Sequence, residues 1–142
     1  MENTILSWLS DLGIDGITLM QILFSLMISI LFIQSGLDKV FNWKGEKDFY
    51  TSHFKKSILN GTVPLLMPVI TISELAAGFL SGIGLLVFLF TGRTELAFLG
   101  ALMACLSIIQ LFFGQRVAKD YAGAASLIPY FFLAAACLYF YL

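Results

Sequence analysis

VPLLMPVITISELAAGFLSGIGLLVFLF, residues 63–90, is an apolar run that contains a single acid, Glu74. About 20 apolar residues span a bilayer as a helix, so this run is long enough to cross with tilt or a kink. Backbone groups in lipid must be satisfied within the segment, which favours a helix over a strand. Pro64 and Pro68 fall in its first turns, where a missing amide donor matters least.

Three further apolar runs occupy residues 17–37, 96–113 and 122–142, and Pro129 should kink the last of them. The composition is 59% hydrophobic and only 12% charged, with a mean hydropathy of +0.92. Soluble domains carry about 25% charged residues, so a soluble globule is excluded. We therefore predict an all-α polytopic membrane protein, in which residues 1–142 form one integral membrane domain built as a four-transmembrane-helix bundle.

The loop at residues 38–62 and the loop between the last two runs together hold seven of the eight Lys and Arg residues. The positive-inside rule then places both loops in the cytoplasm and both termini outside. No Lys or Arg precedes the first run, so a signal peptide is not expected. Residues 4–12 predict a short interfacial helix with Trp8 at headgroup depth, and Tyr139 and Tyr141 predict an outer aromatic belt.

The first loop contains GEKDFYTSHFKKSILNG, residues 45–61. Tyr50, Phe54 and Ile58 recur at i, i+4 and i+8, while Lys47 and Lys55 fall on another face. This pattern predicts an amphipathic interfacial helix on the inner leaflet. Two uses stay open: anchoring against anionic lipid, or docking of a partner protein.

Glu74 is the most informative residue, because a charged carboxylate inside a span costs at least ~2.5 kcal/mol. A stripe of small residues follows it at helical spacing, which predicts that this face packs inside the bundle. The stripe is Glu74, Ala77, Gly78, Ser81 and Gly82. Each of the other spans offers polar groups at comparable depth, so we expect an intramembrane polar cluster around Glu74. Its expected members are Gln34, Ser35, Gln110 and Tyr130.

Two interpretations of this cluster remain open. Glu74 is either a neutral, hydrogen-bonded acid that sets helix register, or a protonatable site that holds a quinone headgroup or relays a proton. Asp38 and Lys39 are either interfacial flanks, or Lys39 reaches upward and pairs with Glu74. The turn with Arg116 and Lys119 is either a solvated connection or a site for an anion or lipid headgroup.

The sequence lacks the residue patterns that several other kinds of site require. His53 is the only histidine and lies in the loop, so paired-histidine haem ligation within the bundle is excluded. No spacing suits a metal site, and the net charge of −1 gives no nucleic-acid footprint. Cys105 and Cys137 lie far apart within apolar runs, so we expect both to be buried. We expect no metal and no covalently bound cofactor, which leaves a quinone as the cofactor to consider.

Three short motifs carry a family resemblance. They are Ser35-Gly36-Leu37-Asp38-Lys39, then Glu74-Leu75-Ala76-Ala77-Gly78 with Gly82-Ile83-Gly84-Leu85 in the proline-led second run, and Thr91-Gly92-Arg93. Together they resemble the DoxX family of small four-helix bacterial membrane proteins. The motif positions that carry over are Gly36, Lys39, Glu74 and Gly78. The resemblance implies the bacterial inner membrane, and a link to membrane oxidoreductases such as the thiosulfate:quinone oxidoreductase after which the family is named.

The leading hypothesis is an accessory subunit of a quinone-linked redox complex, without catalytic activity on its own. Its partners would be the lipid bilayer and other membrane subunits, with no nucleic acid. One rival is a quinone-reactive enzyme subunit, with Glu74 as proton acceptor and Tyr130 or Gln34 orienting the headgroup. A second rival is a non-redox scaffold in a secretion, transport or envelope complex.

Overall fold

The computed structural model describes residues 3–142, and this part of the chain is helical without any strand. Its helices are α1 (Thr4–Asp11), α2 (Gly16–Phe41), α3 (Trp43–His53), α4 (Val63–Thr91), α5 (Glu95–Val117), α6 (Tyr121–Ser126) and α7 (Ile128–Tyr141). Four stretches are long and apolar enough to cross a membrane: α2, α4, α5, and α6 together with α7. The predicted all-α, four-helix membrane bundle is confirmed.

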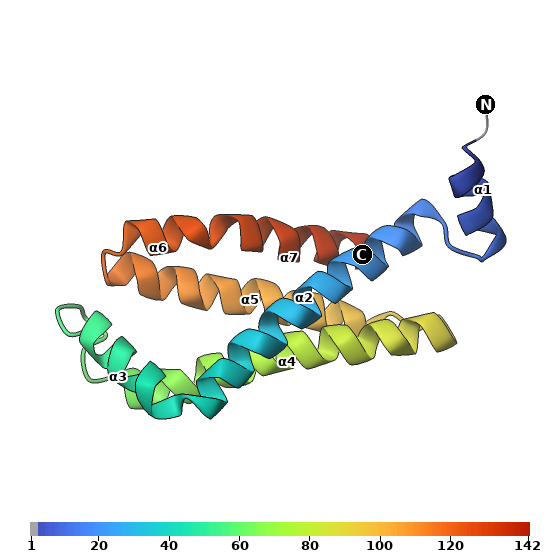
Figure 1. The fold of residues 1–142 in the computed structure, drawn as a ribbon. Coiled ribbons are helices and arrows are strands. Elements are labelled where there is room, and N and C mark those ends of the chain that lie inside the picture. The colour runs from blue at the N-terminus through green and yellow to red at the C-terminus, as the bar shows by residue number, and fades with distance from the viewer. Residues whose placement is uncertain (1–2) are drawn as a thin grey trace.

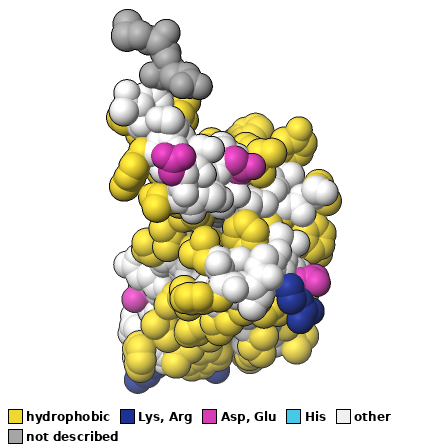
Figure 2. Space-filling view, turned by 90° about the vertical axis from the view of Figure 1, so that its right-hand side faces the viewer, with side chains coloured by type: hydrophobic (Ala, Val, Ile, Leu, Met, Phe, Trp, Pro, Cys, Tyr) yellow, Lys and Arg dark blue, Asp and Glu magenta, His cyan; other side chains and the backbone are white. Residues whose placement is uncertain are grey.

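Helix α4 lies at the centre of the packing, against α2 on one side and α5 on the other, and α7 packs on α5 and α2 (Figure 1). α2 crosses the other spans diagonally, and α1 and the C-terminal end of α7 lie toward the end of the bundle opposite α3 (Figure 1). We call the end that carries α3 the basic end, and the opposite one the α1 end. Figure 2 views the α1 end and shows hydrophobic side chains over most of that face.

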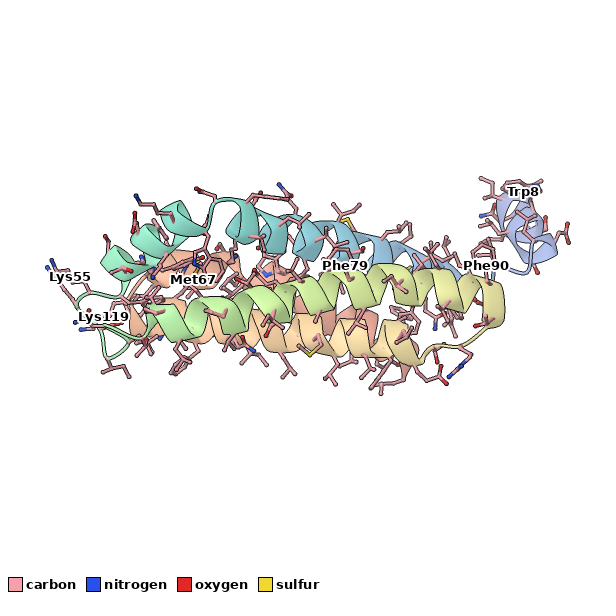
Figure 3. The ribbon with its side chains drawn as sticks, turned by 90° about the horizontal axis from the view of Figure 1, so that it is seen from below. Trp8, Lys55, Met67, Phe79, Phe90 and Lys119 are labelled. Atoms are coloured by element: carbon pink, nitrogen blue, oxygen red, sulfur yellow. The ribbon has the colours of Figure 1, made fainter. Side chains whose placement is uncertain are left out.

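Small residues allow these helices to approach closely, as the stripe behind Glu74 predicts. A Cβ on Gly78 would lie 2.6 Å from the backbone nitrogen of Ile33 in α2. A Cβ on Gly100 of α5 would collide with the backbone of Ser81 in α4. In lipid, such packing replaces the hydrophobic effect as the force between helices. Large apolar side chains instead face outward, for example Phe90 at 85% exposure, and contact the bilayer (Figure 3).

The three prolines lie near the starts of α4 and α7. Pro64 occupies the first turn of α4, and Pro68 is accommodated inside that helix. Pro129 lies in the first turn of α7, and the chain breaks at Leu127 between α6 and α7. The expected kink is therefore a break between two helices, because proline supplies no donor to the preceding turn.

The end of the first span differs from the sequence prediction. α2 continues to Phe41, so Asp38 and Lys39 lie on the span and not in a loop. Asp38 and Lys39 interrupt the apolar run. A prediction from hydropathy therefore ends the span at residue 37, although the helix continues. α1 confirms the short helix expected over residues 4–12, and Trp8 is 62% exposed on it, away from the bundle (Figure 3).

The first loop contains a helix, α3, as predicted, but this helix is shorter than the spacing of Tyr50, Phe54 and Ile58 indicated. α3 ends at His53, and residues 54–62 form turns. Phe54 turns inward and packs with Val63 and Met67 in a small second core, whereas Ile58 is 83% exposed. The i, i+4, i+8 stripe fails at its last member because the helix ends before reaching it.

Candidate functional site

Glu74 lies in a buried ion pair where α2 crosses α4. Its Oε2 lies 2.8 Å from Nζ of Lys39, and its Oε1 accepts a hydrogen bond of 2.9 Å from the Ser35 hydroxyl. Lys39 also donates to the Ser35 Oγ at 3.3 Å. The Lys39 and Glu74 side chains are 6% and 1% exposed. The three residues form a closed cluster, which we call the Lys–Glu–Ser cluster.

Helix geometry brings these three side chains together. Ser35 and Lys39 are four residues apart on α2 and therefore share one face. Gly36 lets Leu75 of α4 approach, because a Cβ there would lie 2.5 Å from the Leu75 Cδ2. One turn further along α4, Gly78 lets the backbone of α2 approach in the same way. The four motif positions Gly36, Lys39, Glu74 and Gly78 thus meet at one helix crossing.

The electrostatics of the cluster are those of a compensated pair. An isolated buried charge costs several kcal/mol, and a partner in good geometry repays much of that cost. Glu74 lies about 16 Å along α4 from Val63, at 1.5 Å per residue, and so in the half nearer the basic end. Lys39, in the last turn of α2, reaches it from that end. The alternative in which Lys39 pairs with Glu74 is therefore the one found.

The remaining members of the expected polar cluster lie elsewhere. Gln34 is exposed, since it points about 100° away from Ser35 around the helix. Gln110 is also exposed, and its amide donates to the Ser73 hydroxyl at 3.4 Å. Tyr130 is 43% exposed on α7. Of the residues that we expected around Glu74, only Ser35 reaches it.

A second polar contact, at the α1 end, was not anticipated. Ser25 of α2 shares a hydrogen bond of 2.8 Å with the Tyr141 hydroxyl, and the Gln21 amide donates to the Phe140 carbonyl at 2.8 Å. Tyr141 is 9% exposed, so it belongs to the core and not to the expected aromatic belt, whereas Tyr139 is 72% exposed. The i, i+4 spacing of Gln21 and Ser25 is the sequence signal that could have revealed this contact.

An apolar groove of about 220 Å³ opens at the basic end between the first loop, α4 and α5. His53 attaches the first loop to the end of α5 and to the residue before α6. Its Nε2 lies 2.6 Å from Oε1 of Gln115 and 3.7 Å from Oδ2 of Asp120. Tyr50 forms part of the groove wall, and burial raises the pKa of this phenol above its ordinary value. The loop is thus part of the folded bundle.

Among residues 3–142, no three His, Cys, Asp or Glu side chains gather in a way that could hold a metal ion. Cys105 and Cys137 are free and buried. No family model, no curated protein and no solved structure matches this chain. The site must therefore be interpreted from its own geometry.

Proposed function

We propose that this chain is a small accessory membrane subunit, resembling the DoxX family, that works within or beside a quinone-linked redox assembly. The accessory role rests on one observation: the Glu74 carboxylate is 1% exposed and enclosed by its neighbours, with Oε1 hydrogen-bonded to Ser35 and Oε2 in ion-pair contact with Lys39 but without a hydrogen bond. A proton acceptor for a quinone needs a free oxygen within hydrogen-bond reach of the substrate. Glu74 instead joins α2 to α4, which is a structural task.

The link to a redox assembly is supported by the motif that forms this crossing. Gly36, Lys39, Glu74 and Gly78 are the positions that resemble the DoxX family, and they act together as one helix contact. In this proposal the four motif positions serve to build the bundle. Electron transfer belongs to the partner subunits, and the bundle supports them in the bilayer.

We propose a bacterial inner-membrane location with both termini on the periplasmic side. Support comes from charge, because seven of the eight Lys and Arg residues lie in the last turn of α2, in the first loop or near the turn from α5 to α6, whereas Arg93 alone lies in the turn from α4 to α5. The test uses Asn3→Cys and Lys55→Cys, each in a Cys105→Ala/Cys137→Ala background, with a membrane-impermeant maleimide. Residue 3 should be labelled on intact spheroplasts and residue 55 only after lysis; the reverse pattern overturns the orientation.

The decisive experiment is purification from native membranes in a mild detergent, followed by mass spectrometry of co-purifying proteins and extracted quinone. Oxidoreductase subunits should accompany the chain. Recovery with only phospholipid, or with secretion components, would overturn the redox link. The folded double variant Lys39→Met/Glu74→Met should retain the quinone-reductase activity of the assembly, whereas its loss would mean that Glu74 takes part in turnover.

The second candidate is a non-redox scaffold, and one observation favours it. Phe49 and Ile58, on the segment outside the four spans, are 59% and 83% exposed. In this second proposal Phe49 and Ile58 contact a partner protein. A scaffold would lose a secretion, transport or envelope partner on Phe49→Ala/Ile58→Ala but not on the exposed control Asn60→Ala, and no oxidoreductase would co-purify.

A further inference from the structure

The groove at the basic end opens toward the lipid-facing surface of the bundle. Val69 on α4 and Phe113 on α5 flank it, and they are 48% and 56% exposed. Its remaining walls come from Leu66, Ile70 and Leu111, together with Tyr50 and Phe54 of the first loop. An apolar depression at this position faces acyl chains and not water.

The size of the groove suits a chain more than a ring system. Its volume is about 220 Å³, below the roughly 300–1,000 Å³ of pockets that enclose drug-sized ligands. The polar side chains of its lining, Tyr50, Gln110 and Gln115, are few. A flexible hydrocarbon chain fills such a half-open, apolar space without needing hydrogen bonds along its length.

The rim of the groove is basic. Phe54 lines the groove, and the next two residues along the chain are Lys55 and Lys56, both exposed. Ala118 packs against the small core of Phe54, and Lys119 follows it. Lys55 and Lys119 extend from the same end of the molecule in Figure 3.

One acid, Asp120, follows Lys119 in the chain and is engaged by neighbouring groups. The Asp120 carboxylate accepts a hydrogen bond from the backbone amide of Gly123 through Oδ1, and its Oδ2 faces His53 at 3.7 Å. Lys55, Lys56 and Lys119 are all exposed. Apolar groove and basic rim together match an amphiphile with an anionic head.

We propose that this groove binds an acyl chain of an anionic phospholipid, whose phosphate lies against Lys55, Lys56 and Lys119. The charge of the rim selects the headgroup, and the groove holds the chain. A single chain is needed, so the second acyl chain remains in the bilayer. The site is independent of any redox role and would exist in a scaffold as well.

The test is native mass spectrometry of the full-length protein, delipidated in a mild detergent and titrated with phosphatidylglycerol or with phosphatidylcholine of the same acyl chains. Wild type should bind phosphatidylglycerol more tightly. Lys55→Gln/Lys119→Gln should weaken this binding by up to about thirtyfold, since each lysine near an anionic surface contributes roughly a factor of five. The control Lys44→Gln/Arg93→Gln removes the same charge from exposed positions outside the groove and should bind as wild type does.

A groove-filling substitution, Leu111→Trp, separates chain binding from headgroup binding and should weaken both lipids. The exposed lysine variants keep the test decisive should Leu111→Trp not fold, as judged by circular dichroism. Equal binding of the two lipids by wild type would overturn the proposal. So would unchanged binding in the Lys55/Lys119 variant, or displacement of phosphatidylglycerol by an equimolar quinone.

Discussion

Breaking the Lys–Glu–Ser cluster from one side should be far more costly than removing its charged pair altogether. In Lys39→Met, the Glu74 carboxyl group remains at 1% exposure with only Ser35 as a partner. Removal of one member of a buried pair typically costs about 3–5 kcal/mol, so Lys39→Met and Glu74→Gln should each lose stability in this range. Lys39→Met/Glu74→Met leaves no buried charge, and its stability should lie near that of wild type or above it.

The assay is equilibrium unfolding in mixed dodecyl maltoside and dodecyl sulfate micelles, followed by circular dichroism for all four proteins. Lys44→Met and Glu95→Gln, at exposed positions, are the matched controls and should leave the unfolding midpoint unchanged. The reasoning fails if the double variant loses the sum of the two single losses. It also fails if each single variant loses no more than the ~1 kcal/mol of an ordinary hydrogen bond.

Two further predictions concern a helix crossing and a helix start. Gly78→Ala places a methyl group 2.6 Å from the backbone nitrogen of Ile33 and should lower stability by about 1–3 kcal/mol in the same assay; Gly16→Ala, which meets nothing within 4 Å, should not. Asp15 accepts a 2.7 Å hydrogen bond from the Thr18 amide, and this bond lowers the pKa of the Asp15 carboxyl. Because the folded pKa lies below the unfolded one, the stabilisation of the α2 start is complete above the unfolded value and is lost as the pH falls through the folded value. Hydrogen exchange at Thr18, corrected for its intrinsic pH dependence, should follow this loss in wild type but not in Asp15→Asn; a pH-independent wild type would contradict it.

Hydropathy and small-residue spacing predicted the four spans and the inward face of α4, because both patterns are local in the chain. The partner of Glu74 was less accessible. The sequence predicted the pairing of Lys39 with Glu74 only as one of two alternatives. Choosing it required knowing that α2 continues past residue 37. Ser35 and Gln34 lie at almost the same depth in the membrane, so the sequence predicted both as partners of Glu74. They point in different directions around α2, and only Ser35 faces Glu74. Depth is readable from the sequence, whereas the angle between two packed helices is not.

The first loop shows the same limit for a different reason. Phe54 and Ile58 have the spacing of one amphipathic face, and a sequence pattern cannot show where the helix ends. The close approach of the Phe54 ring to Gly114, where an added Cβ would lie 3.3 Å from Cζ, fixes the turn against α5. This is a contact between residues far apart in the chain, and it also creates the groove.

The polar side chains of α2 explain why this helix crosses the bundle diagonally (Figure 1). Lipid does not favour one apolar neighbour over another, so hydrogen bonds and small residues decide which helices associate. At the α1 end, Ser25 binds Tyr141 and so selects α7. At the basic end, Lys39 binds Glu74 and so selects α4. Two different partners at the two ends of one straight helix require a crossing angle, and the small residues of α4 allow that crossing to be close.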